Sequence, residues 1–255
     1  MSNEQAVIDL ISGEEAEWFG DAPAAETPRE TPSRRRFRAI HRLLRRRIAM
    51  LDYPPGQRLD IDRLAAELNV SRTPIRSVLQ QMEFEGLVST LHGVGTTVTA
   101  IDTAHLREAV DLRTRLAELI GVLSPLAPSA EAIGWLRTAR QACDGLYEDR
   151  DIRKFAAIDM RLHDAICTVI GNSLLLKTYD DLYYRTARMW FYFLPKLDWH
   201  QEIAIFASDI DQTRNAMIRG DTRAVGFLVR NAVSAAVIRL DDLIAQAETD
   251  TLELG

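Results

Sequence analysis

Apolar residues recur at helical spacing over long parts of the chain, and one short region alternates as strands do. Between residues 33 and 50, isoleucine and leucine return every three or four positions, with arginines between them. The stripe consists of Ile40, Leu43, Leu44, Ile48 and Leu51. A second amphipathic stretch, 60–68, follows a proline-glycine turn, and Ser71 stands where it would cap a third helix. The pattern predicts three helices.

Two β-prone runs follow these helices. They span 86–90 and 96–99, and the turn between them contains His92, Gly93 and Gly95. This spacing predicts a two-stranded hairpin, or wing. Two short helices followed by a wing indicate a winged helix-turn-helix, whose second helix enters the major groove of DNA with its N-terminal residues against base edges.

The same segment carries a specific series of short motifs. They are PG at 55–56, LA at 64–65, VSRTPIR at 70–76 and EGL at 85–87, with Gly95 in the wing. This series resembles the winged-helix domain of the GntR family of bacterial transcription regulators, which usually has valine where this chain has Ile75. The resemblance implies a bacterial regulator that binds double-stranded DNA.

Side chains suited to DNA contact cluster around the third predicted helix. Arginine pairs with guanine edges or phosphates, serine and threonine with either, and a proline in the first helical turn costs no hydrogen bond. The residues expected to contact DNA are Arg45, Arg46, Arg47, Arg58, Ser71, Arg72, Thr73, Pro74, Arg76, His92 and Gly93. We expect 45–47 on phosphates, and Arg72 and Arg76 near base edges.

The charge distribution supports this interpretation more than the net charge does. The whole chain carries −6 at pH 7, which alone does not suggest a nucleic-acid partner. Residues 29–98 hold thirteen arginines against seven acids, whereas residues 99–255 hold eighteen basic and twenty-three acidic residues. Only the predicted DNA-binding region is cationic, as phosphate contacts require. A membrane-surface helix is the alternative for 33–50, but its apolar face is needed to close the winged-helix core.

Length and composition limit the class of protein. A chain of 255 residues that is 47% hydrophobic can bury two modest cores. Without a long apolar run or a leader-like start, we expect a cytoplasmic protein with no membrane partner. Cys143 and Cys167 lack CxxC spacing and are expected to be buried thiols. Residues 1–33 are expected to form a flexible acidic arm, and 248–255 a tail.

From residue 102 onward helical periodicity replaces the strand signals. Helices are predicted at 102–123, 129–148, 151–170, 173–194, 197–219 and 221–247. We therefore expect a mainly α protein, with a winged helix-turn-helix at 34–100 and an all-helical bundle at 101–247. The bundle resembles the FCD ligand-binding domain of the FadR-type branch of the GntR family. The matching residues are Arg113, Leu116, Asp159, His163, Gly171, Asn172, Leu175, Ala216, Gly220 and Asp221.

Asp159 and His163 are candidates for ligand binding, because a spacing of four places both on one helical face. In the FCD branch the matching pair is joined by two histidines, and the four side chains hold a divalent metal that binds the effector. At those two positions this chain has Ile210 and Ala232, which cannot ligate a metal. The nearest possible substitutes lie off this register: His200, Asp209 and Asn231. A metal at Asp159 and His163 is therefore disfavoured; direct effector contact and a core histidine bonded to Asp159 are the alternatives.

The remaining candidates complete a predicted effector pocket. Arg113 should point inward from the first bundle helix, where it needs an anion, either Asp159 or a ligand carboxylate. Tyr183 and Trp190 are expected to line the same pocket. The sequence thus predicts a ligand-responsive transcription regulator, in its favoured form a repressor, that binds a palindromic operator as a homodimer and responds to a small organic acid. The linker 98–102 would transmit the response.

Two other functions are weighed against this one. The first is a constitutive DNA-binding protein whose bundle only dimerises, with its pocket collapsed around Ile210. The second is a metal-dependent enzyme built on Asp159 and His163. The missing metal ligands and the absence of a paired nucleophile and base argue against an enzyme.

Overall fold

The computed structural model describes residues 31–91, 93 and 95–253 and divides the chain into two compact units, 1–102 and 103–255. The elements of the first unit are α2 (Pro32–Ala49), β1 (Arg58–Leu59), α3 (Ile61–Glu67), α4 (Arg72–Phe84), β2 (Val88–Leu91) and β3 (Gly95–Val98). Over the described residues, every helix is too short or too polar to cross a bilayer.

Helix α2 supplies the apolar face expected from its leucine and isoleucine stripe. Ile40, Leu44 and Ile48 are completely buried against the rest of the first unit. Thr31 caps the helix by accepting a hydrogen bond from the Arg34 amide. The apolar stripe of α2 ends at Ile48 and does not include Leu51. Leu51 lies beyond the end of α2, with a positive φ of 64°.

Helices α3 and α4 form the helix-turn-helix. Asp60 caps α3 through its carboxylate, which accepts hydrogen bonds from the amides of Asp62 and Arg63. Ser71 occupies the cap position of α4 as predicted, but its side chain makes no capping hydrogen bond. The inward face of α4 is apolar, with Ile75 and Val78 completely buried. The opposite face is therefore left to solvent.

The wing is a three-stranded antiparallel sheet in the order β1-β3-β2. Strands β2 and β3 form the predicted hairpin, shifted by one or two residues from 86–90 and 96–99. Strand β1 was not predicted, because two residues are too short for an alternating pattern to be visible. It pairs Arg58 with Thr97 on β3 and so ties the segment before α3 to the wing.

The second unit is all helical, as expected. Its helices are α5 (Thr103–Glu118), α6 (Ala130–Asp144), α7 (Ile152–Cys167), α8 (Ser173–Phe193), the short 3-10 helix η1 (Leu194–Lys196), α9 (Trp199–Ile218) and α10 (Thr222–Glu253). Asp151 and Asp221 cap α7 and α10 by accepting hydrogen bonds from the amides of Lys154 and Ala224. Gly220, with φ of 70°, separates α9 from α10.

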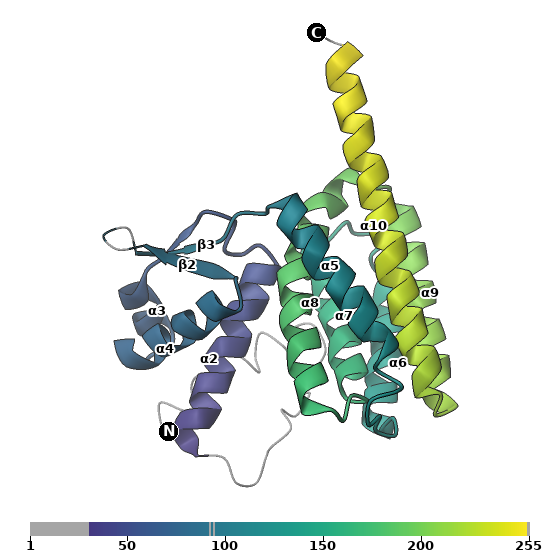
Figure 1. Ribbon diagram of the computed structural model, residues 1–255, viewed down its shortest axis with the longest axis horizontal. Coiled ribbons are helices and arrows are strands. Elements are labelled where there is room, and N and C mark those ends of the chain that lie inside the picture. The colour runs from purple at the N-terminus through teal and green to yellow at the C-terminus, as the bar shows by residue number, and fades with distance from the viewer. Residues whose placement is uncertain (1–30, 92, 94, 254–255) are drawn as a thin grey trace. The chain divides into compact units, whose positions relative to one another are not determined.

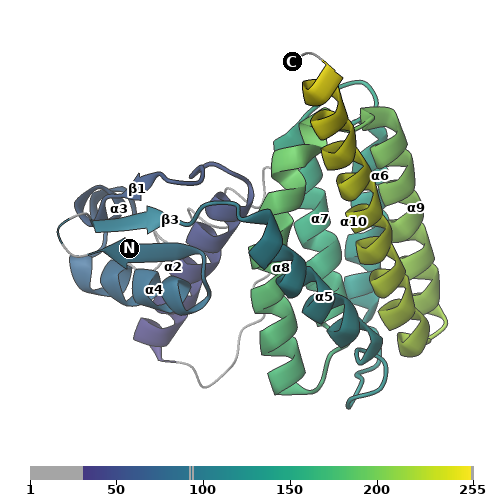
Figure 2. The same ribbon diagram turned by 45° about the horizontal axis from the view of Figure 1, so that its top comes forward.

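These helices close into a ring around an interior. Helix α5 packs on α8, α8 on α7, α7 on α6, α6 on α9, α9 on α10, and α10 returns to α5. The side-by-side run of α9 and α10 is visible in both orientations (Figures 1 and 2). Inward-facing residues of several different helices can therefore meet at one place inside the bundle.

Candidate functional site

The first turn of α4 is presented to solvent. Ser71, Arg72, Thr73 and Arg76 are all exposed, and Pro74 is half-buried. Arg72 forms a surface ion pair with Asp62 of α3. An exposed first turn with two arginines and a threonine is the arrangement by which a helix-turn-helix contacts base edges.

Two further predicted DNA contacts lie on the sheet. Arg58 of β1 is exposed. Gly93, in the turn of the wing, is exposed and has a φ of 78°, a conformation that favours glycine. His92 falls outside the described residues.

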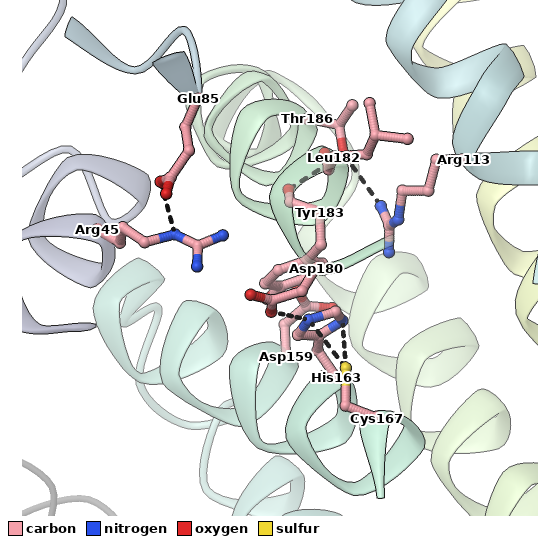
Figure 3. A network of polar contacts seen from close by, with 10 residues as sticks. All are labelled: Arg45, Glu85, Arg113, Asp159, His163, Cys167, Asp180, Leu182, Tyr183 and Thr186. Carbon is pink, nitrogen blue, oxygen red and sulfur yellow. Dashed lines mark hydrogen bonds and ion pairs between the residues drawn. The ribbon is translucent and has the colours of Figure 1, made fainter. Parts of the chain in front are cut away.

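The arginines of α2 differ from the expectation that all three face phosphates. Arg45 is buried, with its Nε 3.3 Å from the Glu85 carboxylate (Figure 3). Arg47 donates to Glu67 at 2.5 Å and to the Tyr53 hydroxyl at 3.0 Å. The prediction for Arg45 is wrong because position 45 falls on the core side of α2, next to Leu44. Arg46, half-buried, remains a predicted phosphate contact.

Glu85, part of the EGL motif, has a structural role that the sequence did not reveal. Its carboxylate accepts hydrogen bonds from His41 at 2.8 Å and from Gln81 at 2.9 Å, in addition to the contact with Arg45. Burial raises the pKa of Glu85, but His41 and Arg45 outweigh burial and the net shift is downward. A buried charged carboxylate thus joins α2 to α4.

The helical ring of the second unit contains a cavity of about 140 Å³. One buried water needs roughly 10 to 15 Å³, so the cavity has room for a small ligand. The five residues that the sequence assigned to the effector pocket all line it: Arg113, Asp159, His163, Tyr183 and Trp190. They come from α5, α7 and α8, and α9 and α10 complete the wall. The structure brings the five together, while their binding role stays a prediction.

Asp159 and His163 do not bond to one another in this site. Asp159 accepts a hydrogen bond from the Tyr183 hydroxyl at 2.7 Å, whereas His163 Nε2 lies 2.8 Å from Asp180 Oδ1. The His163 ring stacks on the Tyr183 ring, with centroids 3.6 Å apart (Figure 3). Burial raises the pKa of the Asp159 carboxyl, although the Tyr183 hydrogen bond and the Arg113 charge oppose that shift. Burial and the adjacent Asp159 raise the pKa of Tyr183.

Arg113 points inward, as predicted. Its Nη1 donates to Thr186 Oγ1 at 3.2 Å, and its guanidinium carbon lies 5.0 Å from the Tyr183 ring centroid (Figure 3). The buried Nε has no hydrogen-bond partner among the described residues. Arg113 is therefore a positive charge held mainly by aromatic faces and by the nearby Asp159 carboxylate.

Helix α9 contributes two acids to the lining of the cavity, Glu202 and Asp209. Glu202 accepts two hydrogen bonds from Arg239 of α10, at 2.8 and 3.1 Å. Asp209 lines the cavity, and burial together with Asp159 and Glu202 raises its pKa to about 6, against a lowering by Arg239. A signal was present: Glu202 and Asp209 stand seven residues apart, on one face of a helix whose buried positions are otherwise mostly apolar.

The expected register of α9 is therefore off by one residue. Ile210 is completely buried but does not belong to the lining of the cavity, whereas Asp209 does. Ala232 lines the cavity as expected. The spacing taken from the family placed Ile210 at a ligand position, and one residue of error rotates a side chain by about 100°.

The four-ligand metal site of the FCD branch does not fit these residues. Ala232 has no ligand atom, and although Asp209 faces the cavity in place of Ile210, Asp159 and Asp209 belong to no cluster of three or more potential metal ligands among the described residues. Within the described part of the chain, the ligand atoms that lie within 4.8 Å of one another belong to His163, Cys167 and Asp180. Cys167 Sγ lies 3.3 Å from His163 Nε2, so these three side chains already form a hydrogen-bonded cluster (Figure 3).

Comparison with protein families identifies both units. Residues 37–98 match the model of bacterial regulatory proteins, gntR family, and residues 108–235 match the FCD domain, which by itself covers half of the chain. The chain belongs to the GntR family. It is a transcription regulator in which a DNA-binding helix-turn-helix precedes a helical FCD domain, and members of this family are regulators rather than enzymes.

Named relatives support this assignment. An uncharacterised HTH-type transcriptional regulator of Streptomyces ambofaciens is 31% identical over 147 residues, 56% of this chain and 60% of that protein. The Uxu operon transcriptional regulator of Escherichia coli is 27% identical over 216 residues, 76% of this chain and 82% of that protein. A probable D-xylose utilization operon transcriptional repressor of Paenarthrobacter nicotinovorans is 30% identical over 47% of this chain and 52% of that protein. The chain thus spans little more than half the length of two of these relatives.

Solved structures show the same fold at low sequence identity. Escherichia coli McbR/YncC superposes with a TM-score of 0.68 at 16% identity, over 83% of this chain and 98% of that chain. A putative transcriptional regulator GntR from Rhodococcus sp. RHA1 gives 0.58 at 21% identity, over 81% and 98%. A winged helix-turn-helix followed by a helical domain is therefore the fold of this GntR-family protein.

Proposed function

We propose that this GntR-family regulator is a repressor that binds a palindromic operator as a homodimer and is released by a small organic acid in the bundle cavity. The observation that carries the proposal is Arg113, an inward-pointing arginine on the wall of a cavity large enough for a ligand. An arginine in such a place offers charge-assisted hydrogen bonds to a ligand carboxylate.

The exposed first turn of α4 supports the DNA-binding half of the proposal. Arg72, Thr73 and Arg76 would contact base edges, with Ser71 and Pro74 against the backbone. One recognition helix covers only a few base pairs, so specificity among many genomic sites requires two half-sites and hence a dimer. The name of the Paenarthrobacter relative, a probable repressor, favours repression over activation.

Ligand control would operate as a shift between populations. A ligand that binds one arrangement of the dimer better than another must move the equilibrium toward the arrangement it prefers. The linker 98–102 connects the two units and would carry the change. Release requires that the ligand-bound population hold the two recognition helices at a spacing that does not match the operator.

A constitutive regulator with a collapsed bundle is the competing function. It would need the interior to be filled, with Ile210 occupying the place of a ligand. Ile210 lies in the core away from the cavity lining, and the cavity of about 140 Å³ remains. These two observations favour the ligand-responsive regulator.

The test uses an operator selected from random-sequence DNA and measures its affinity by fluorescence anisotropy. Operator affinity should fall when a responsive acid is found in a panel of mono-, di- and hydroxycarboxylic acids. Arg113→Met should keep operator binding and lose the response, whereas Arg137→Met, an exposed arginine on α6, should keep both. Affinity that stays constant with every acid would contradict the effector assignment, and protection of a single half-site by a monomer would contradict the dimer.

A further inference from the structure

The effector cavity contains more negative than positive charge. Its charged lining groups are two guanidinium groups and three carboxylates, with His163 counted as neutral: Arg113, Arg239, Asp159, Glu202 and Asp209. The balance is therefore −1. Glu202 and Arg239 offset one another through their two hydrogen bonds, and Arg113 is offset by the nearby Asp159.

Asp209 is the lining carboxylate that remains after these two pairs of opposite charges are set aside. Among the described residues, no hydrogen bond or ion pair to its side chain is found, although the side chain lines the cavity. Other charged groups act on it from three helices: Asp159 from α7, Glu202 from α9 and Arg239 from α10. A partly buried carboxylate with no partner of its own is unfavourable, because burial removes part of its hydration without replacing it.

The net negative charge of the lining limits which ligands the cavity accepts. A simple monoanionic acid would bring a second unbalanced negative charge into the same cavity, and like charges at close range oppose binding. A ligand that also carries a positive group would leave the charge balance unchanged and would give Asp209 the partner it lacks.

We propose that the effector is a small zwitterion of the amino-acid class, whose carboxylate binds Arg113 and whose ammonium group binds Asp209. This inference rests on the proposed function and narrows its effector from organic acids in general. Arg113 and Asp209 lie on α5 and α9, which α10 separates in the helical ring. Apolar side chains line the wall around them, including Phe155, Trp190 and Phe206, so a neutral ligand side chain is expected.

The proposal is tested by calorimetry on the full chain with matched sets of three ligands. Each set contains a proteinogenic amino acid with a neutral side chain, the carboxylic acid that lacks its amine, and the amine that lacks its carboxyl; leucine, 4-methylpentanoate and 3-methylbutylamine form one set. At least one amino acid should bind wild type at least tenfold more tightly than either of its two analogues.

A variant at position 209 tests whether Asp209 causes the preference for the amino acid over its analogues. Asp209→Asn removes the unpartnered charge and should fold, because it relieves an unfavourable burial. It should bind the amino acid and the matching acid with similar affinity. Asp211→Asn is the control, since Asp211 lies on the same helix but pairs with Arg140. It should keep the tenfold preference.

The pH dependence gives an independent readout. Asp209, whose pKa is raised to about 6, is mostly ionised at pH 7.5 and mostly protonated at pH 5. The affinity for the amino acid should therefore fall about tenfold between these two pH values in wild type. His163, Asp159 and Glu202 also line the cavity and remain in the variant, so a pH dependence that persists in Asp209→Asn would overturn the role of Asp209.

Three other results would also overturn the inference. Acids that bind as tightly as their amino acids would restore the simple organic-acid effector and leave the proposed function intact. Absence of binding by the whole amino-acid panel would exclude this ligand class, while release of the operator by another acid would still support the proposed function. Stoichiometric Zn²⁺ or Mn²⁺ binding that is lost in Asp209→Asn would show that a metal ion, not an ammonium group, balances the cavity.

Discussion

At the scale of single residues, a buried carboxylate organises the DNA-binding unit. Glu85 receives hydrogen bonds from His41 and Gln81 and contacts the buried Arg45. Because Glu85 and Arg45 are both buried, loss of the Glu85 charge would disrupt a buried ion pair, which is far more damaging than loss of a surface ion pair. The EGL motif therefore has a physical reason in the packing of α2 on α4.

We expect Glu85→Gln to lower the free energy of unfolding of the first unit by about 3 kcal/mol at pH 7. The pKa of Glu85 lies below its ordinary value of 4.5, so its ionised form stabilises the fold above that pH, and this contribution is lost as the pH falls further. The difference between wild type and variant should thus narrow below pH 4.5. Urea denaturation of both proteins across pH 3.5 to 7 measures this difference in the free energy of unfolding. Glu67→Gln, at a partly exposed pair, should cost under about 1 kcal/mol at any of these pH values.

Base recognition is assigned to arginines at the start of α4. Arg76→Ala, or Arg72→Ala, should reduce operator affinity by on the order of 1 to 3 kcal/mol and relax the preference at one base position. Arg46→Ala should instead weaken all DNA sequences alike and reduce the salt dependence by about one unit of slope. Anisotropy with operator and scrambled DNA separates the two classes, and Arg137→Ala is the control. Wild-type affinity in both α4 variants would show that this helix does not enter the major groove.

At the scale of elements, helices and the wing hairpin could be predicted because their signals are local. The apolar stripe of 33–50, the capping residues Asp151 and Asp221, and Gly220 all act within a few positions of the chain. The two-residue strand β1 could not be predicted, since its pairing with β3 depends on contacts distant in sequence. The end of α5 at Glu118 was placed five residues too late for the same reason, because the following residues turn against α10.

The close approach of α10 to α5 explains why α5 ends at Glu118, and it also gives a prediction. A Cβ added at Gly226 of α10 would lie 2.6 Å from the Ala117 carbonyl oxygen of α5, a backbone atom that cannot easily move. Gly226→Ala should therefore destabilise the second unit by roughly 1 to 3 kcal/mol, the usual cost of overpacking. Gly134→Ala on α6 meets open space and should be neutral or stabilising by about 1 kcal/mol. Thermal denaturation of the two variants compares them. Equal stability would mean that α5 and α10 do not pack this closely.

The cavity shows where element-level prediction from sequence stops. Arg113, Asp159 and His163 were found because they match a family pattern, and the structure places all three in the lining of one cavity. Their partners were not found, since Tyr183 pairs with Asp159 and Asp180 with His163 across helices whose relative rotation no local pattern encodes. Asp209 was named only as a substitute lying off the expected register, and an error of a single position is enough to exchange a carboxylate for a buried isoleucine.

At the scale of the whole molecule, the two units must be coupled if the protein is a ligand-controlled regulator. The cavity lies within the second unit and the recognition helix within the first, so the two ligands bind to different units. Any influence of one on the other is then a coupling free energy between two sites. Such coupling is reciprocal for equilibrium binding.

Reciprocity provides the last prediction. If a ligand lowers operator affinity by a factor of about 10 to 100, a saturating operator must lower ligand affinity by the same factor. Calorimetric titration of ligand into free protein and into the protein-operator complex measures the second factor, and anisotropy measures the first. Scrambled DNA of equal length is the control, because its weaker binding should leave ligand affinity close to that of free protein. If the two factors differ well beyond error, the ligand acts by another route, such as direct competition for the DNA-binding surface or a change in the fraction of dimer.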